Sequence, residues 1–292
     1  MTKSKIKEIG GEILKRGLNL FEGTGIGKIS IVSRLFTYLA STYDLRITKE
    51  VKGHKFTVRA SPQSLFYFSG RFEPSVTDLY CSLLKEGMTV ADVGASTGYY
   101  TLLASKIVGS TGLVLSFEPE PHRFRELVDN ILINKCNNVK PFKLAISDKE
   151  GETEFELLDA LGYGCVVRAR KSVEKRKRIQ VKTATLDSFL HSLSIDDVDL
   201  VKIDVEGAEL EVLRGMRRIL SRGKVKIICE VHPDGLSSLG YSTEDVENIL
   251  KEYGYEIYLI SPDGLIPTDS IGDTYAHYLF TAEEVTDARK DA

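Results

Sequence analysis

Hydrophobic and polar residues follow two different patterns along this chain. From Met88 onward, short apolar runs alternate with segments in which apolar residues recur every three to four positions, a pattern typical of βαβ units around a parallel sheet. Up to about Tyr80 the pattern is irregular. We therefore expect a helical and aromatic cap over residues 1–85 and a Rossmann-like α/β domain, with a mostly parallel sheet, over residues 86–292.

The regular part of the chain predicts its elements one by one. Strands are expected at 88–94, 113–118, 139–145, 198–204, 225–232, 255–260 and 276–281, and helices at 99–107, from 121 onward, around 212–220 and from 242 onward. The segment between the last two strands contains Pro262, Gly264 and Pro267, which suit a loop between antiparallel strands. Three additional strands, at 152–158, 164–168 and 179–185, indicate an insertion over about 152–185 or a hairpin at one sheet edge. In the cap, a helix is expected at 29–43, a strand at 54–59 and an aromatic loop at 66–72.

The composition is that of an ordinary globular protein and excludes several classes. The 292 residues include 39 basic and 42 acidic side chains, which gives a net charge of −3, and 42% of them are hydrophobic. These values do not fit disorder, and the near-neutral charge argues against general nucleic-acid binding. The four cysteines form no CxxC pair, so neither a disulfide framework nor a zinc site is predicted, and a reducing cytoplasm fits best.

The N-terminal region carries no sign of a leader or of a transmembrane segment. Its most apolar stretch, residues 26–40, is broken by Lys28 and Arg34 and is shorter than the ~20 apolar residues of a span. It could lie on a membrane surface, pack on the sheet or contact a second subunit, so peripheral membrane contact and a homodimer are both open. Residues 23–28 look like a phosphate loop, but the spacing is one residue short and Ile29 replaces the magnesium-binding hydroxyl, so we reject that site.

The clearest chemical signal is the segment DVGASTG at residues 92–98. It stands where an apolar strand ends and a helix begins, the place where α/β folds bind nucleotides. Ser96 occupies the position of the second glycine in the dinucleotide fingerprint, where the backbone must approach a pyrophosphate. A ligand without phosphates, such as adenosylmethionine, is therefore favoured, and a tight turn without any ligand is the alternative. The candidate cofactor-binding residues of this segment are Asp92, Gly94, Ala95, Ser96 and Gly98.

Further cofactor contacts are predicted at the ends of the next two strands. Glu118 follows Gly94 at close to the spacing of ~20 residues expected for the acid that binds ribose hydroxyls. Ser147 and Asp148 come after the third strand, where an acceptor group could meet the adenine amine. The same two residues are also compatible with a simple turn, so both interpretations stay open.

Ionisable residues follow the fourth and fifth strands of the α/β domain. KIDVEG at 202–207 ends one strand and EVHP at 230–233 ends the next, and in a doubly wound sheet both ends open on one cleft. Two uses fit these residues: a general base that removes a proton from an acceptor hydroxyl, or a carboxylate and imidazole set that holds a divalent cation. We favour the base over the metal. The candidate catalytic residues are Asp204, Glu206, Glu230 and His232, and the alternative for Glu206 and Glu209 is an acid that interacts with a helix dipole.

Four segments in one order now resemble a known family. DVGASTGYYT, FEPEPHRFRELVDNI, TLDSF and VKIDVEGAELEVLRGM are together similar to the FkbM family of adenosylmethionine-dependent methyltransferases, over roughly residues 73–260. The resemblance implies a class I methyltransferase sheet of seven strands and O-methylation, often of a sugar hydroxyl in a glycolipid, polysaccharide or natural product.

The resemblance also implies roles for particular residues. By it, Asp92, Gly94 and Gly98 contact the methionine part of the cofactor, Glu118 the ribose, and Ser147 with Asp148 the adenine. Glu73, in RFEP, resembles a glutamate that family members carry just before the first strand, and it would close the cofactor pocket. The basic run over residues 168–178 has two interpretations, a contact for an anionic sugar, lipid or phosphate group and a solvated hairpin tip.

The sequence therefore predicts an adenosylmethionine-dependent O-methyltransferase that acts on a small-molecule or carbohydrate acceptor. In this hypothesis Asp204 or His232 takes the proton of the acceptor hydroxyl, and Glu206 with Glu230 orients or binds the acceptor. Two alternatives are a nicotinamide-dependent oxidoreductase and a binding or scaffold protein that has the fold without turnover.

Overall fold

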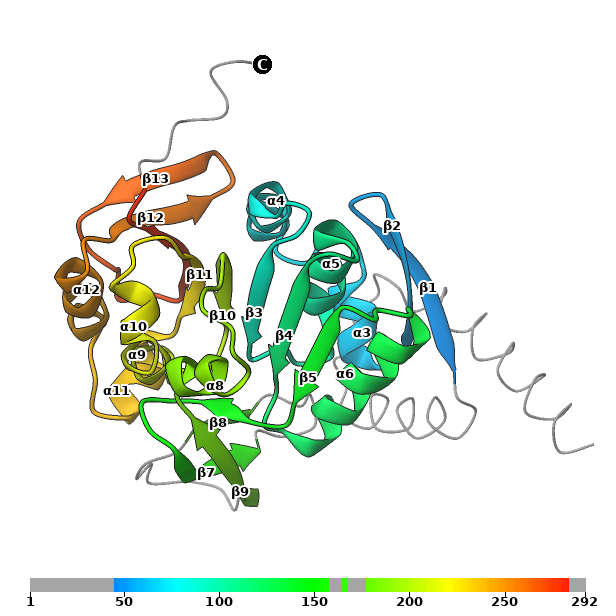
Figure 1. The fold of residues 1–292 in the computed structure, drawn as a ribbon, viewed down its shortest axis with the longest axis horizontal. Helices are drawn as coiled ribbons and strands as arrows, with labels where there is room; N and C mark the ends of the chain where they lie inside the picture. The colour runs from blue at the N-terminus through cyan, green and yellow to red at the C-terminus, as the bar shows by residue number, and fades with distance from the viewer. Residues whose placement is uncertain (1–44, 158–163, 167–176, 284–292) are drawn as a thin grey trace, which may run out of the picture.

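The computed structural model describes residues 45–157, 164–166 and 177–283, and its largest feature is one eight-stranded sheet (Figure 1). The strands are β3 (Thr89–Val93), β4 (Leu113–Phe117), β5 (Val139–Phe142), β10 (Leu200–Ile203), β11 (Lys226–Val231), β12 (Glu256–Ser261), β13 (Gly264–Thr268) and β14 (Ala276–Thr281). Their order is β13-β12-β14-β11-β10-β3-β4-β5. The sheet is parallel from β11 to β5 and antiparallel where β14 pairs with β11 and β12. The expected mostly parallel α/β architecture is confirmed, and the carboxyl ends of β3, β4, β10 and β11 meet at one edge.

The outer edge of the sheet beside β12 differs from the expectation. Residues 264–268, expected in a loop, form β13 and add an eighth strand to the seven that the resemblance implied. Two residues, Pro262 and Asp263, separate the paired Ser261 and Gly264, so the connection is a tight hairpin. Pro267 is tolerated because β13 is an edge strand, in which one row of backbone groups needs no partner.

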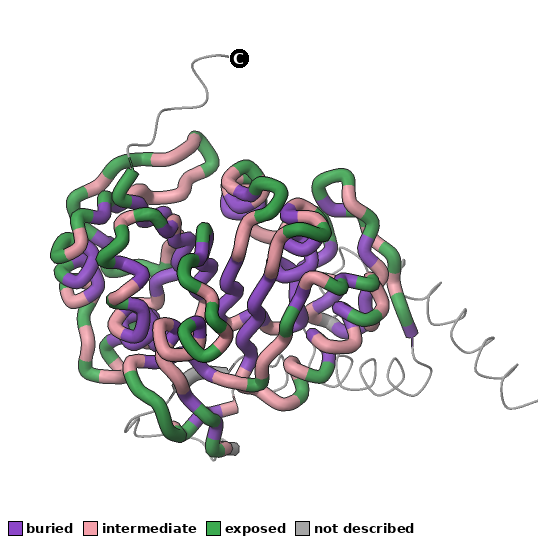
Figure 2. Tube along the Cα trace, in the orientation of Figure 1, coloured by how far each residue is buried: buried purple, intermediate pink, exposed green. Residues whose placement is uncertain are grey.

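Helices cover both faces of the sheet. They are α5 (Tyr99–Val108), α6 (Pro121–Ile133), α8 (Leu186–Ser192), α9 (Glu209–Arg214), α10 (Arg217–Leu220), α11 (Pro233–Ser238) and α12 (Thr243–Glu252). Residues of α5 and α6, such as Leu102 and Leu127, belong to one hydrophobic cluster, whereas residues of α9 and α12, such as Leu213 and Leu250, belong to another. Figure 2 shows the central strands among the buried parts of the chain, which is the position of a sheet enclosed by helices.

Local signals in the sequence explain where these helices begin and end. Pro121 occupies the first turn of α6, and Ser242 forms a capping box with Asp245 at the start of α12, as its side chain predicts. The single helix expected around 212–220 is instead divided into α9 and α10 by Gly215, whose Cα packs against the backbone of Ser147. A side chain at position 215 would place its Cβ 2.1 Å from the Ser147 carbonyl oxygen, so the break occurs where the chain passes the end of another strand.

A second sheet accounts for the expected insertion. Its strands are β6 (Ala145–Ile146), β7 (Gly151–Leu157), β8 (Gly164–Val166) and β9 (Lys177–Ala184), in the order β6-β9-β7-β8. The strand expected at 139–145 therefore divides, because the chain leaves the main sheet after Phe142 and joins the second one at Ala145. The extra strands form this separate sheet and not a hairpin on the edge of the main one. Most of the basic run, residues 167–176, lies outside the described residues.

The described part of the cap packs on α5. It comprises β1 (Arg46–Val51), β2 (His54–Arg59), α3 (Pro62–Tyr67) and α4 (Pro74–Leu83). The strand expected at 54–59 is confirmed, but the aromatic stretch expected as a loop begins inside α3, which Ser61 caps. Phe56 and Phe68 share a hydrophobic cluster with Tyr99 of α5. The helix expected at 29–43 and the rejected phosphate loop lie outside the described residues.

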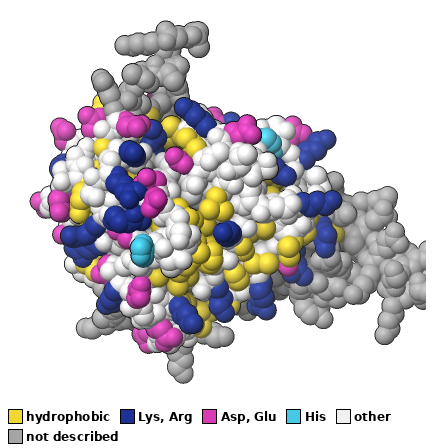
Figure 3. Space-filling model, in the orientation of Figure 1, with side chains coloured by type: hydrophobic (Ala, Val, Ile, Leu, Met, Phe, Trp, Pro, Cys, Tyr) yellow, Lys and Arg dark blue, Asp and Glu magenta, His cyan; other side chains and the backbone are white. Residues whose placement is uncertain are grey.

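The surface in Figure 3 carries hydrophobic side chains across the middle of the visible face, with acidic and basic side chains interspersed around them. The mixture of signs agrees with the small net charge of −3. Among the described helices, none combines the length and the apolar character needed to cross a membrane.

Candidate active site

The glycine turn after β3 is held between two neighbouring strands. The backbone N–H groups of Gly94 and Ala95 both donate to the carbonyl oxygen of Phe117, at the end of β4. On the other side, Gly94 has a φ of +86°, and a Cβ there would lie 1.8 Å from the carbonyl oxygen of Asp204, after β10. Only glycine fits this position, because both the backbone conformation and the available space exclude a side chain.

Glu118 is a buried acid whose carboxylate faces backbone donors. Its side chain is 3% exposed, and its two oxygens accept hydrogen bonds of 2.8 Å from the N–H groups of Ser96 and Glu120. Burial raises the pKa of Glu118, while the Arg123 guanidinium and these backbone hydrogen bonds oppose that rise. An ionised carboxylate has about four lone-pair sites, so acceptor capacity remains for two hydroxyl groups of a ligand.

A cleft of about 660 Å³, part of it open to solvent, runs along the carboxyl ends of the strands. Gly94, Ser96 and Glu118 line it after β3 and β4, and Asp204 and Glu206 line it after β10. Glu230 and His232, which the sequence predicted on the same cleft as Asp204 and Glu206, are not among its lining residues.

Several lining residues were missed by sequence reasoning, and four of them come from other elements than the predicted strand ends. Tyr67 reaches the cleft from α3, Arg123 from α6, Ile146 from β6 and Phe155 from β7. The aromatic segment at residues 66–72 could have indicated Tyr67 as a lining residue, but sequence reasoning assigned that segment only to the cap. Ile146 and Phe155 come from the second sheet, whose place beside the cleft depends on tertiary packing that no local pattern encodes.

Several predicted cofactor residues stand behind the cleft and not on its surface. Asp92 accepts a 2.5 Å hydrogen bond from the Thr101 hydroxyl on α5, and burial raises its pKa. Ser147 donates to a carboxylate oxygen of Glu211 at 2.9 Å and to Asp148 at 3.3 Å. Ala95 is buried, and a Cβ at position 98 would lie 2.7 Å from a methyl carbon of Leu127. These residues shape the turns around the cleft in the structure.

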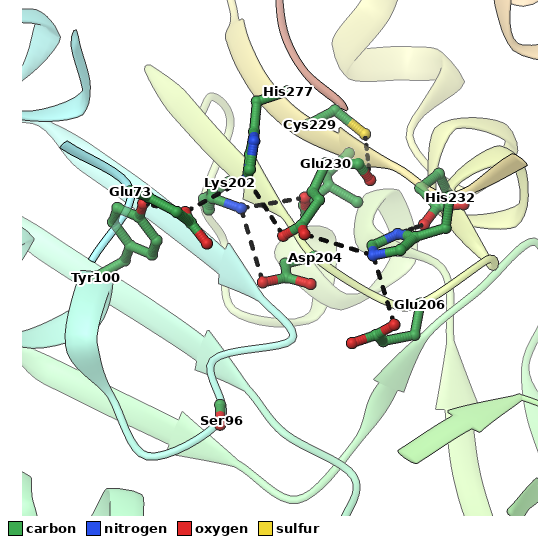
Figure 4. A network of polar contacts seen from close by, with 12 residues as sticks. Glu73, Ser96, Tyr100, Lys202, Asp204, Glu206, Cys229, Glu230, His232 and His277 are labelled. Carbon is green, nitrogen blue, oxygen red and sulfur yellow. Dashed lines mark hydrogen bonds and ion pairs between the residues drawn. The ribbon is translucent and has the colours of Figure 1, made fainter. Parts of the chain in front are cut away.

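Beyond Asp204 lies a network of ionisable side chains, drawn in Figure 4. Lys202 is fully buried, with its Nζ 3.9 Å from Asp204 Oδ2 and 5.1 Å from the centre of the Tyr100 ring. Burial and the neighbouring Glu230 raise the pKa of Asp204 well above its ordinary value, although Lys202 lowers it. Asp204 is thus a carboxyl group with a strengthened affinity for a proton, at the edge of the cleft.

His232 is fixed from three directions. Its Nδ1 lies 2.8 Å from Glu209 Oε1, and its Nε2 lies 3.4 Å from Glu206 Oε2 and 3.5 Å from Glu230 Oε1. Glu209 is itself buried and accepts a 2.8 Å hydrogen bond from the N–H of Gly207. Burial alone would lower the pKa of His232, but the hydrogen bonds to Glu209 and Glu230 raise it to about 11. The interpretation of Glu209 as a simple helix acid missed this role.

A second histidine completes the network on the opposite side of Glu230. His277 Nε2 lies 3.4 Å from Glu73 Oε2 and 3.4 Å from Glu230 Oε2, and Tyr100 donates a 2.6 Å hydrogen bond to Glu73 Oε2. Burial lowers the pKa of His277, but contacts with Glu230 and Glu73 raise it to about 9. The sequence left His277 unassigned, because only the antiparallel pairing of β14 with β11 sets it opposite Glu230.

Three of the six described non-glycine residues with a positive φ lie at these positions. Glu73, Ser96 and Glu206 have φ values of 40°, 50° and 55°, a region that residues other than glycine rarely adopt. Strained backbone of this kind persists where surrounding structure holds it, and it is frequent at functional sites. The close backbone contact between Gly207 and Gly235 is one such support, since a Cβ on either would lie within 2.6 Å of the other's Cα.

Comparison with known proteins finds one matching family and several methyltransferases that this chain resembles. The family description "Methyltransferase FkbM domain" matches residues 92–257. The hexuronic acid methyltransferase AglP of Haloferax volcanii is 28% identical over 205 residues, which cover 70% of this chain and 79% of AglP. The 2-O-methyltransferase NoeI of Sinorhizobium fredii is 25% identical over 119 residues, 36% of this chain and 48% of NoeI. A crystal structure of methyltransferase FkbM from Methylobacillus flagellatus is 17% identical, with a TM-score of 0.44 over 71% of this chain and 52% of that one.

The strand order and the turn after β3 define the class, which is that of the class I methyltransferases. The chain belongs to the FkbM methyltransferase family, and it is an adenosylmethionine-dependent methyltransferase. This membership favours methyl transfer over the nicotinamide-dependent alternative.

Proposed function

We propose that this protein is an O-methyltransferase whose acceptor is a hydroxyl group of a sugar or of a sugar-containing molecule. The observation that carries the proposal is the shared cleft, in which Gly94 and Glu118 face Asp204 and Glu206. Among the relatives, one is named as a hexuronic acid methyltransferase, and this name describes a sugar acid as the acceptor. Another is named as a 2-O-methyltransferase, and this name describes transfer to an oxygen.

The residues of the cleft fit adenosylmethionine. When bound, this cofactor supplies a methyl group on a positively charged sulfur to a nucleophilic oxygen. Gly94 and Ser96 line the cleft, and the remaining acceptor capacity of Glu118 suits the two ribose hydroxyls. Ile146 and Phe155 offer an apolar surface for a flat purine ring. In this proposal Asp92, Ala95, Gly98, Ser147 and Asp148 hold the turns that carry these contacts.

Asp204 is the group that we assign as the general base. It lines the cleft, and its raised pKa makes it a better proton acceptor than an ordinary carboxylate. His232, with a pKa of about 11, is positively charged at neutral pH and suits donation of a hydrogen bond to an acceptor oxygen. Glu206 and Glu230 then hold His232 and the acceptor hydroxyls in place.

The test has two stages, because cofactor and acceptor can be separated. Calorimetric titration with adenosylhomocysteine needs no acceptor, and NADH serves as the control ligand. The wild-type protein should bind adenosylhomocysteine but not NADH, and Glu118→Ala should lose most of that affinity. Transfer of a labelled methyl group is then measured on a panel of uronic-acid and neutral oligosaccharides. Full turnover by both Asp204→Asn and His232→Ala on the true acceptor would show that the catalytic assignment is wrong.

A further inference from the structure

Glu73, Glu230 and His277 come together from three elements that are far apart in the sequence. Glu73 precedes α4 in the cap, Glu230 lies on β11 and His277 on β14. Glu230 and His277 are direct partners across the antiparallel pair, so their side chains emerge on the same face of the sheet. Glu73 reaches them with a φ of 40°, which is a strained conformation for glutamate.

Ion-pair contacts hold these three side chains together. His277 Nε2 lies 3.4 Å from an oxygen of each carboxylate, beyond the usual N–H···O range of about 2.7–3.2 Å. Within the described residues, this buried nitrogen makes no hydrogen bond. Two ligand atoms that are each ~2.1 Å from one tetrahedral ion lie about 3.4 Å apart. The two N···O distances are compatible with ligand atoms around one metal ion, and one ligand atom from each of the three residues lies within 4.8 Å of the others.

The surroundings supply the outer contacts that a metal site needs. Tyr100 donates to Glu73 Oε2 at 2.6 Å, which orients that carboxylate in the way outer partners orient metal ligands. Tyr275 lies beside the group, with its hydroxyl in contact with Glu230 and its ring 5.5 Å from that of His277. The side chains of Glu73, Glu230 and His277 are 14%, 7% and 12% exposed, so the group is enclosed without being sealed from solvent.

The charge of the network also favours a cation. Five carboxyl groups take part in it, namely those of Glu73, Asp204, Glu206, Glu209 and Glu230. The basic side chains of the network are Lys202, His232 and His277, so five carboxyl groups face three basic groups when all of them are ionised. A buried excess of negative charge is costly unless a cation compensates it.

We propose that Glu73, Glu230 and His277 bind a divalent transition-metal ion. One imidazole nitrogen with two carboxylates suits Mn²⁺, Fe²⁺ or Zn²⁺ better than Mg²⁺, which prefers oxygen ligands and keeps much of its water. The ion ties the cap to the ends of β11 and β14 and keeps Glu230 in position beside His232. A remaining coordination position is available to water or to an oxygen of the acceptor. The proposal goes beyond the proposed function and does not depend on it.

Cation binding can be measured without any methyl acceptor. The full-length protein, freed of metals with a chelator and dialysed, is titrated calorimetrically with MnCl₂ and ZnCl₂, with MgCl₂ as the comparison, and Mn²⁺ binding is checked by electron paramagnetic resonance. We expect one Mn²⁺ or Zn²⁺ site and much weaker binding of Mg²⁺. His277→Gln and Glu73→Gln should each reduce the affinity by more than about 10-fold, whereas His54→Gln, on β2, is the control and should leave it unchanged.

A second set of variants separates this site from its neighbour. Asp204, Glu230 and His232 form another group that could hold an ion and that shares Glu230. Retained binding in His232→Gln together with loss in His277→Gln supports the proposal. Loss in His232→Gln alone overturns it in favour of the neighbouring group, and absence of binding to the folded wild-type protein overturns it outright. Circular dichroism checks the fold of each variant, and if Glu73→Gln unfolds, His277→Gln decides the outcome. Adenosylhomocysteine titration of the same samples tests the proposed function independently.

Discussion

The two sides of the cleft satisfy their polar groups in different ways. On the cofactor side, the oxygens of Glu118 accept short hydrogen bonds from backbone N–H groups, and Gly94 packs directly on a neighbouring backbone. On the opposite side, Glu206, Glu230 and His232 satisfy one another through side-chain contacts of 3.4–3.5 Å. Backbone hydrogen bonds and backbone packing fix the positions of the groups on the first side without any ligand. The second side depends on ion pairs among side chains, so changes on the two sides should have different consequences.

The largest effect is expected for Gly94→Val on the cofactor side. The added side chain would overlap the carbonyl oxygen of Asp204, and the φ of +86° disfavours any residue but glycine, so we expect a loss of about 3 kcal/mol or more in the free energy of unfolding. Urea denaturation measures this loss. Gly53→Ala is the matched control, because Gly53 has a similar φ of +76° with no atom near a new Cβ, and about 1 kcal/mol is expected there. Equal losses in the two variants would refute the packing argument.

On the opposite side, Asp204→Asn should abolish most turnover without affecting cofactor binding. Loss of a general base lowers kcat by about 10²- to 10⁴-fold. The affinity for adenosylhomocysteine should change little, because asparagine keeps the shape of the side chain and the backbone contact with Gly94. Single-turnover methyl transfer and calorimetry measure the two quantities. A parallel fall in both would mean that the two sides are not functionally separate.

Glu118→Gln should give the reverse pattern. The amide can accept on one side only, so one of the two backbone donors, on Ser96 or Glu120, loses its partner, and the ribose loses a charged acceptor. We expect the Kd of adenosylhomocysteine to rise by about 10-fold or more, and kcat at saturating cofactor to change much less. If kcat fell while Kd stayed constant, Glu118 would belong to the chemical step instead.

The smallest effect is expected far from the cleft, at the capping box of α12. Ser242→Ala removes a side chain that accepts from the Asp245 N–H, and about 1 kcal/mol of stability should be lost at neutral pH. Hydrogen bonds from Ser242 lower the pKa of Asp245. The stability linked to this carboxylate is therefore present above its unfolded-state pKa and lost as the pH falls through the lower folded-state pKa. The difference between wild type and variant, measured by urea denaturation, should shrink in acid.

Local sequence patterns predicted much of the fold. Most strands from residue 88 onward and the helices α5, α6, α9 and α12 followed from hydrophobic periodicity, and α6 and α12 begin where Pro121 and Ser242 indicated. The short helices α8 and α11 were not predicted. The patterns failed where a second sheet or an edge decided the structure. β13 contains a proline and a glycine, which signal a loop, and it is a strand only because β12 lies beside it.

The candidate site shows the same division. Gly94 and Glu118 could be predicted because the turn and the strand end that carry them are contiguous in the sequence. Asp204, Glu206, Glu230 and His232 could be grouped because parallel strands end at one edge. Phe155 and His277 could not be predicted, because each reaches the site through a strand pairing between distant segments. The local sequence around a single phenylalanine or histidine does not indicate which residue it will contact.

The contact between Gly94 and Asp204 has a consequence for how such an enzyme can diversify. The main chain that receives the cofactor and the main chain that carries the assigned base touch at this point, so their separation is set by backbone geometry alone. Substitutions of side chains cannot lengthen or shorten it. New acceptor preferences in this scaffold would have to arise at the periphery, in α3 of the cap and in the second sheet. The distance between the cofactor turn and the backbone of Asp204 would stay the same.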